Sequence, residues 1–149
     1  MASILLIDDD VDVRTSVQRV LEYAGHTVRA VADGSYGIHS FRQRRPDLVI
    51  TDIIMPGQEG IETIRELQKI DASIPIIAIS GGGPTQSQLD YLKLARQFGA
   101  VATLWKPFRA AALRELVNDV LIKRALRNEP PAASEPDTSD PSSCVDKSA

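Results

Sequence analysis

The sequence has little of three features that would assign it to a class at once: cysteine, long apolar runs and excess positive charge. Its 149 residues include one cysteine, Cys144, so no disulfide can form within the chain and a reducing compartment is expected. No apolar run approaches the length of a membrane span, and residues 1–3 lead directly into an apolar segment rather than a secretion signal. These absences predict a cytoplasmic protein without membrane contact.

Positive charge is too sparse to indicate a nucleic-acid partner. The net charge is −3, but residues 129–149 hold five acidic residues against one lysine, which leaves residues 1–128 with a net charge of +1. A nearly neutral body lacks the basic footprint that attracts phosphate backbones, so we expect no direct nucleic-acid contact. The one basic concentration, Arg42, Arg44 and Arg45, is expected to be a solvated helix end.

Residues 128–149 contain no aromatic residue and, apart from alanine, a single aliphatic one, Val145. They also hold four of the nine prolines and five serines. Such a segment cannot bury enough apolar surface to offset the entropy lost on ordering. We therefore expect one globular domain over residues 1–127 and a disordered Pro/Ser/acidic tail over residues 128–149.

Two kinds of segment alternate along the domain. Runs of four to six residues rich in Ile and Val predict strands buried on both faces at residues 4–7, 28–31, 48–51, 74–79 and 101–105. Apolar residues at helical spacing lie between and after them, at residues 13–24, 61–67, 89–98 and 113–121, with the least regular stripe at residues 35–44. This alternation predicts a parallel sheet covered by helices on both faces.

Residues that favour the ends of helices support the same division of the chain. Gly25 and Gly99 each follow a helical stripe, where a left-handed cap is favoured. Asp10 is expected to cap a helix that starts at Val11, and Asp12 to lie in its first turn. Of the acidic residues that crowd residues 8–12, these two are therefore interpreted as structural.

The remaining polar residues fall where the strands end. In an open parallel sheet, ligands collect at the carboxyl ends of the strands. Asp8 and Asp9 follow the first strand, Asp52 the third, Ser80 the fourth and Lys106 the fifth. Converging carboxylates suit Mg²⁺, and a lysine and a hydroxyl suit phosphoryl oxygens. Because an aspartate can act as a nucleophile, this set indicates phosphoryl transfer through an acyl phosphate.

These motifs resemble, in order and spacing, those of a response regulator receiver domain, and the resemblance covers residues 3–125. It is carried by Asp8-Asp9, by Asp52 followed by Met55-Pro56-Gly57, by Ser80, and by Lys106-Pro107-Phe108. The resemblance implies an α/β fold, a flavodoxin-like three-layer sandwich with a five-stranded parallel sheet of order 2-1-3-4-5 and five helices.

The resemblance also implies a role for each site residue. Asp52 would accept the phosphoryl group, and Ser80 and Lys106 would contact it, with a cis peptide between Lys106 and Pro107. The metal, Mg²⁺, would be held by Asp9 and Asp52 directly, by the backbone carbonyl of Ile54, and by Asp8 through a bound water.

The function implied is that of a stand-alone response regulator receiver in two-component signalling. Mg²⁺-dependent transfer from a phosphohistidine to Asp52 would switch a protein-interaction surface. The expected partners are a sensor histidine kinase or histidine phosphotransfer protein as donor, and a downstream protein as target. Such a chain catalyses its own aspartyl phosphorylation and dephosphorylation rather than turning over a substrate, so we do not expect an enzyme.

Two departures from the family pattern affect signal transmission. The family usually has an aromatic residue three positions before the lysine, where this chain has Thr103, and Trp105 is not expected to replace it. Ser80 is followed by Gly81-Gly82-Gly83-Pro84, whose glycines permit many backbone conformations. We expect that loop to rearrange on phosphorylation.

Two alternatives stay open at the level of sequence. A phosphatase of the haloacid-dehalogenase type would use Asp8 as nucleophile and Asp10 as acid. Against it, Asp12 stands where that motif has threonine or valine, and no cap insertion is present. A receiver that had become a constitutive scaffold is the other alternative, and the complete set of site residues argues against it.

Overall fold

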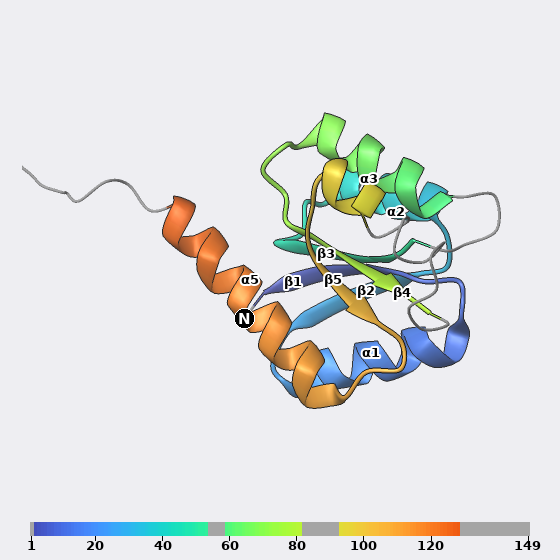
Figure 1. The fold of residues 1–149 in the computed structure, drawn as a ribbon, viewed down its shortest axis with the longest axis vertical. Helices are drawn as coiled ribbons and strands as arrows, with labels where there is room; N and C mark the ends of the chain where they lie inside the picture. The colour runs from blue at the N-terminus through green and yellow to red at the C-terminus, as the bar shows by residue number, and fades with distance from the viewer. Residues whose placement is uncertain (1, 54–58, 82–92, 129–149) are drawn as a thin grey trace, which may run out of the picture.

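Five parallel strands form the sheet in the order β2-β1-β3-β4-β5 (Figure 1). A computed structural model describes residues 2–53, 59–81 and 93–128. The strands are β1 (Ser3–Ile7), β2 (Thr27–Val31), β3 (Leu48–Asp52), β4 (Ile76–Ser80) and β5 (Ala100–Trp105). The strand order implied by the sequence is confirmed.

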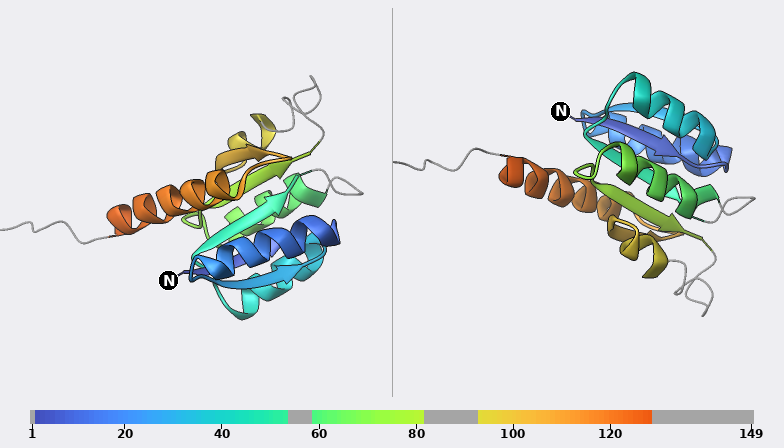
Figure 2. Two further views of the ribbon diagram at one scale, coloured as in Figure 1. Left: turned by 90° about the horizontal axis from the view of Figure 1, so that it is seen from below. Right: turned by 90° about the horizontal axis from the view of Figure 1, so that it is seen from above.

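Helices cover both faces of this sheet, which gives the three layers of the implied sandwich (Figures 1 and 2). They are α1 (Val11–Tyr23), α2 (Gly34–Gln43), α3 (Glu59–Ile70) and α5 (Ala110–Asn128), together with a helical segment at residues 93–97. That segment is the described part of the helix predicted at residues 89–98. In both figures α1 and α5 lie on one face, and α2, α3 and residues 93–97 on the other.

The core consists of two clusters because successive strand residues point to opposite faces. Ile4 and Leu6 of β1 join the cluster under α1 and α5, whereas Leu5 and Ile7 join the cluster under α2 and α3. All four side chains are fully buried. A strand buried on both faces needs a continuous apolar run, which explains why the central strands were recognisable in the sequence.

One strand starts later than its apolar run predicts. The run begins at Ile74, but β4 begins at Ile76. Pro75 has no N–H to give to the ladder, while its carbonyl accepts a hydrogen bond from the Val49 amide at 3.0 Å. The proline therefore lies just before the strand.

The helix with the least regular stripe, α2, depends on its cap and on close packing. The Asp33 carboxylate accepts a hydrogen bond from the Tyr36 amide at 2.9 Å and so caps the first turn. Phe41 is fully buried. At Gly37 a Cβ atom would lie 2.4 Å from Cδ1 of Ile7, so any larger residue there would force the buried Ile7 side chain to shift.

The expected caps are confirmed. Asp10 accepts hydrogen bonds from the amides of Asp12 at 2.9 Å and Val13 at 3.3 Å, which makes it the N-cap of α1. Gly25 and Gly99 have φ values of 100° and 126°, a region that favours glycine.

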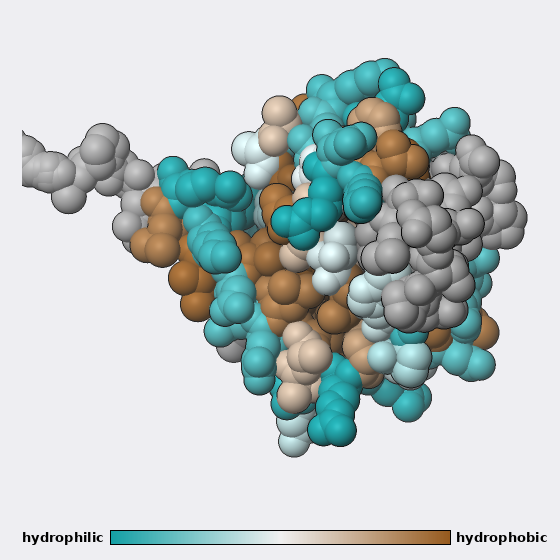
Figure 3. Space-filling model, in the orientation of Figure 1, coloured by the Kyte–Doolittle hydropathy of each residue, from teal (hydrophilic) through white to brown (hydrophobic). Residues whose placement is uncertain are grey.

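The C-terminal half of α5 extends past the sheet (Figure 1). Leu113, Val117 and Val120 are buried against the sheet, as their spacing predicts, but Ile122 and Leu126 are exposed. Figure 3 shows apolar surface alongside this helix. Within the described residues, no helix has the length and apolar character needed to cross a membrane. The predicted tail lies, from residue 129 on, outside the described residues.

The first turn of α3 lies directly against the end of β3. A Cβ atom on Gly60 would be 2.3 Å from the Ile53 Cα and 2.5 Å from the Asp52 carbonyl oxygen. Both of these atoms belong to backbone, which cannot swing aside as a flexible side chain would. Residue 60 therefore has to be glycine for α3 to approach β3 this closely.

We predict that Gly60→Ala lowers the free energy of unfolding by about 2 kcal/mol, the cost of an overpacked contact. Chemical denaturation followed by circular dichroism measures this. The matched control is Gly81→Ala, where a Cβ would meet its nearest atom at an ordinary 3.5 Å. Equal stability of the two variants would contradict the close approach.

Candidate functional site

Two buried carboxylates meet where β1 and β3 end. The strands are paired so that Ile7 lies beside Thr51, which places the following residues, Asp8 and Asp52, next to each other. Asp8 is fully buried and Asp52 is 4% exposed. Two carboxylates removed from water repel each other strongly unless a cation compensates them.

Lys106, which follows β5, supplies that cation. Its Nζ lies 2.9 Å from Oδ2 of Asp52 and 3.0 Å from Oδ2 of Asp8. The Lys106 amide donates a hydrogen bond to the Ser80 carbonyl at 2.6 Å, which fixes the start of this segment to the end of β4. The peptide between Lys106 and Pro107 is cis, as the sequence resemblance implied.

The two carboxylates change the acidity of the lysine. Burial lowers the pKa of Lys106, but the hydrogen bonds to Asp52 and Asp8 and the negative charges of both carboxylates outweigh it. The net result is a pKa raised above the ordinary lysine range. The ammonium form therefore persists at neutral pH, although most of the side chain is buried.

The donor set at this edge fits a hard divalent cation. Asp8, Asp9 and Asp52 each offer a carboxylate oxygen, and these oxygens lie within 4.8 Å of one another. Oδ1 of Asp8 accepts a hydrogen bond from the Asp10 amide at 2.9 Å. Oδ2 is buried and lies 3.0 Å from Nζ of Lys106. Asp9 is exposed beside the two buried carboxylates, and carboxylate oxygens are the ligands that Mg²⁺ prefers.

The sequence-predicted residues are brought together as far as the structure describes them. Asp8, Asp9, Asp52 and Lys106 form one cluster. Ser80 is fully buried at the end of β4. Its carbonyl accepts the hydrogen bond from the Lys106 amide, which places Ser80 beside that cluster. Ile54, expected to offer its carbonyl to the metal, lies outside the described residues, as does the expected loop rearrangement beyond Gly81.

One contact at the site was not anticipated from the sequence. Nη1 of Arg14 donates a hydrogen bond to the backbone carbonyl of Asp8 at 2.6 Å. Arg14 lies in α1, six residues after Asp8, and so ties the helix to the turn that presents Asp8 and Asp9. From the sequence alone, an arginine near the start of a helix is expected to be a solvated charge. Only the structure shows that its side chain contacts the turn before the helix.

This geometry, an acidic cluster and a lysine at the carboxyl edge of a 2-1-3-4-5 sheet, agrees with the comparison to known proteins. The profile of the response regulator receiver domain matches residues 4–118. The chain is a member of the response regulator receiver family.

Relatives of this receiver include short and long proteins. It is 34% identical to the chemotaxis protein CheY of Bacillus subtilis over 119 residues, which cover 79% of this chain and 96% of that protein. It is 32% identical to the C4-dicarboxylate transport transcriptional regulatory protein DctD of Rhizobium meliloti, covering 89% of this chain and 30% of that one. A receiver domain protein from Clostridium thermocellum has a TM-score of 0.77 at 31% identity, with 85% and 99% coverage.

The receiver spans between about a third and just over half of the regulators that match it first, 30% of DctD and 57% of AfsQ1 of Streptomyces coelicolor. Receiver domains signal by phosphorylation rather than by substrate turnover. Family membership leaves the haloacid-dehalogenase alternative without support. Asp10, the acid that alternative requires, is occupied in capping α1.

We predict that Lys106→Met destabilises the metal-free receiver by about 3 kcal/mol at neutral pH, because it leaves two buried carboxylates without their cation. Chemical denaturation in the presence of a chelator measures this. Lys69→Met is the control. The Lys69 side chain is 70% exposed, and its Nζ makes a weak ion pair with Oε1 of Glu66 at 3.8 Å. A loss no larger than that of the control would contradict the bridging role.

The raised pKa of Lys106 gives this prediction a pH window. The stabilisation is fully present below the pKa of an unfolded lysine, about 10.4, and is lost as the pH rises through the higher folded pKa. The stability difference between wild type and Lys106→Met is therefore expected to stay constant from neutral pH to about pH 10 and to shrink above it. A difference that grows with alkaline pH would contradict the assignment.

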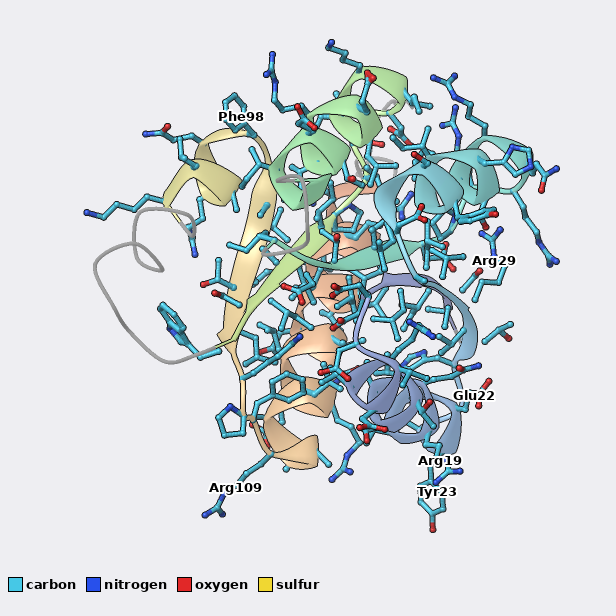
Figure 4. All side chains as sticks on the ribbon, turned by 90° about the vertical axis from the view of Figure 1, so that its right-hand side faces the viewer. Arg19, Glu22, Tyr23, Arg29, Phe98 and Arg109 are labelled. Atoms are coloured by element: carbon cyan, nitrogen blue, oxygen red, sulfur yellow. The ribbon has the colours of Figure 1, made fainter. Side chains whose placement is uncertain are left out.

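We also predict that Arg14→Met weakens Mg²⁺ binding about tenfold, the scale of outer-sphere effects on metal sites. Isothermal titration calorimetry measures the affinity, and Arg14→Lys should restore part of it because lysine can still donate to the carbonyl. Arg19→Met is the control, since Arg19 lies on α1 with its side chain directed away from the body (Figure 4). Unchanged affinity in Arg14→Met would show that the hydrogen bond does not orient the turn.

Proposed function

We propose that Asp52 accepts a phosphoryl group from a phosphohistidine in an Mg²⁺-dependent reaction, and that the modification switches a protein-interaction surface. The observation that carries this proposal is the Lys106 ammonium held within 3.0 Å of both buried carboxylates, with Asp9 beside them. A structural ion pair would need one carboxylate. Three carboxylates and a lysine are the components of a site for phosphoryl transfer.

In the proposed reaction a carboxylate oxygen of Asp52 forms a bond to phosphorus while the phosphorus–nitrogen bond of the donor breaks. The electron pair of that bond stays on the imidazole nitrogen, and Asp52 becomes an acyl phosphate. The Lys106 ammonium, already near Oδ2 of Asp52, neutralises charge on the transferred group, and the Ser80 hydroxyl donates to another of its oxygens.

The metal would be held by Asp9 and Asp52, with Asp8 acting through a bound water and Ile54 through its carbonyl. When bound, Mg²⁺ supplies positive charge to the phosphoryl oxygens and keeps the carboxylates ionised. Asp8 offers a single oxygen to this arrangement, because Oδ1 is engaged by the Asp10 amide. The Arg14 hydrogen bond keeps the turn in that orientation.

The donor is a sensor histidine kinase or a histidine phosphotransfer protein, and it has a surface to approach. An apolar hollow of about 620 Å³ opens beside Lys106, lined among others by Val13, Val17, Phe108 and Leu113. It lies between α1 and the start of α5. Exposed apolar surface rimmed by polar residues marks protein-interaction sites, so we propose that the donor binds there while its phosphohistidine reaches Asp52.

The remaining parts of the proposal concern the chain as a whole. We place the receiver domain at residues 1–127 and the Pro/Ser/acidic tail after it, and we propose that the protein acts in the cytoplasm. The target is a downstream protein rather than a nucleic acid, in keeping with the +1 charge of residues 1–128. The switch is proposed for the receiver whether or not an output domain is attached, since relatives of both kinds exist.

We predict that a small phosphodonor with Mg²⁺ phosphorylates the wild-type receiver but not Asp52→Asn, because the amide cannot form the acyl phosphate. Phosphate-retarding gels and intact mass detect the modification. Addition of a chelator should abolish it.

Two further variants make this test specific. Asp10→Asn retains a capping side chain and should be modified like the wild type. Asp8→Asn should be modified slowly because metal binding is weakened, yet still at residue 52. Equal modification of wild type and Asp52→Asn would end the assignment.

A further inference from the structure

Thr51, the residue before the proposed phosphoacceptor, is a fully buried polar residue among apolar neighbours. Val49 belongs to the cluster under α2 and α3, and successive strand residues alternate, so the Thr51 side chain points to the same face. Its strand partners, Ile7 of β1 and Ala78 of β4, belong to that cluster too. A valine would have the same shape, and a buried hydroxyl destabilises a fold unless it is hydrogen-bonded. The partner of this hydroxyl therefore decides what the threonine contributes.

The Thr51 hydroxyl bonds the peptide that follows the proposed phosphoacceptor. Its Oγ1 donates to the carbonyl of Asp52 at 3.1 Å. At the other end of the same peptide, the Ile53 amide donates to the Ile79 carbonyl at 3.0 Å. The carbonyl is thus held by a side chain and the amide by the neighbouring strand, which together fix the plane of the Asp52–Ile53 peptide.

Helix α3 restricts the same peptide from a third side. A Cβ atom on Gly60 would lie 2.5 Å from the Asp52 carbonyl oxygen, so this oxygen has no room to rotate toward the first turn of the helix. Rotation away from the helix is opposed by the hydrogen bond from Thr51. Loss of the hydroxyl would therefore free the peptide in one direction.

The plane of this peptide influences where the Asp52 carboxylate points. A turn of the peptide is taken up by the backbone dihedrals on either side of the Asp52 Cα, and it reorients the bond from Cα to the side chain. Phosphoryl transfer requires the attacking oxygen to be in line with the bond that breaks. A small displacement of the carboxylate is therefore expected to lower the rate.

The ion pair with Lys106 cannot supply this restraint throughout the reaction. Its Nζ lies 2.9 Å from Oδ2 of Asp52, but an arriving phosphoryl group offers the ammonium further oxygens. The lysine is then shared between the carboxylate and that group. The hydrogen bond from Thr51 to the backbone does not depend on the lysine, so it persists as the group arrives.

From these contacts we infer that Thr51 is a positioning residue for the phosphorylation of Asp52. Its hydroxyl holds the Asp52–Ile53 peptide, so the carboxylate stays aligned with the phosphorus atom while Lys106 turns to the phosphoryl oxygens. Thr51 contacts neither the metal nor the donor in this role and acts through Asp52. The inference rests on the proposed function, since it concerns the rate of that reaction.

The test removes the hydroxyl and keeps the shape of the side chain, in Thr51→Val. The full chain is treated with a small phosphodonor over a range of Mg²⁺ concentrations, and initial rates are measured by intact mass. The rate at saturating Mg²⁺ is expected to fall about tenfold, the effect of one hydrogen bond. The Mg²⁺ concentration for half-maximal rate should change less than about twofold, because Asp8 and Asp9 are unaffected.

Thr51→Ser separates positioning from stability. Serine keeps the hydroxyl but loses a buried methyl group, so this variant should have a lower denaturation midpoint than Thr51→Val. Its rate should nevertheless stay within about twofold of the wild type, because the hydrogen bond to the Asp52 carbonyl is retained. The control is Thr27→Val, an exposed threonine at the start of β2, whose rate should equal that of the wild type.

A local measurement examines the peptide itself without phosphorylation. Amide hydrogen exchange at Ile53 should be faster in Thr51→Val than in the wild type, and unchanged in Thr51→Ser, because the amide and the Asp52 carbonyl belong to one peptide. Unchanged exchange in Thr51→Val would show that the hydroxyl does not restrain the peptide and would overturn the inference.

The kinetic outcomes separate the inference from the proposed function. A wild-type rate in Thr51→Val overturns the role of Thr51 and leaves the proposed function intact, whereas absence of phosphorylation in the wild type overturns both. A rate in Thr51→Ser as low as in Thr51→Val shows that the hydroxyl is not responsible. Rates that follow the denaturation midpoints of the two variants show that the residue acts through stability, which also overturns the inference.

Discussion

The repulsion between two buried carboxylates is the constraint on which the rest of this receiver depends. Asp8 and Asp52 become neighbours because β1 and β3 are parallel and in register, and both lose their hydration when helices cover the sheet. The Lys106 ammonium, 2.9 and 3.0 Å from the two Oδ2 atoms, makes that arrangement tolerable. It can do so only because β5 ends at the same edge, two strands away from β3.

The sequence predicts those parts of the fold and site that depend on pattern. Continuous apolar runs mark strands buried on two faces, and the residues that follow them, Asp8, Asp52 and Lys106, must converge once the strands are parallel. Contacts that depend on how closely two elements approach each other cannot be predicted from a sequence pattern. Gly60 stands against the backbone of Asp52, and Arg14 reaches the Asp8 carbonyl, because α3 and α1 lie close to this edge of the sheet. Those contacts required the coordinates.

The same limit explains α2. Its apolar residues do not form one clean stripe, because Gly37 contributes to the interface by having no side chain at all. Hydrophobic periodicity counts side chains that are present and cannot register a contact made by backbone. The Asp33 cap, in contrast, is a local feature that sequence reasoning can find, although an aspartate after a strand also suits a turn.

Four acidic side chains at residues 8–12 divide by local geometry. Asp10 and Asp12 serve α1, whereas Asp8 uses one oxygen to hold the turn and keeps the other toward Lys106. With Asp9 and Asp52 the cluster holds three carboxylates against one ammonium, so negative charge remains in excess even after the lysine is counted. The single positive charge of Lys106 thus allows the two buried carboxylates to be accommodated but does not neutralise the three carboxylates of the site. That remaining charge favours a divalent cation, and a phosphoryl group added to Asp52 would compete for the same lysine. The Lys106 amide is bonded to the Ser80 carbonyl, so the lysine and the hydroxyl residue are held together at the edge of the sheet where that group would lie.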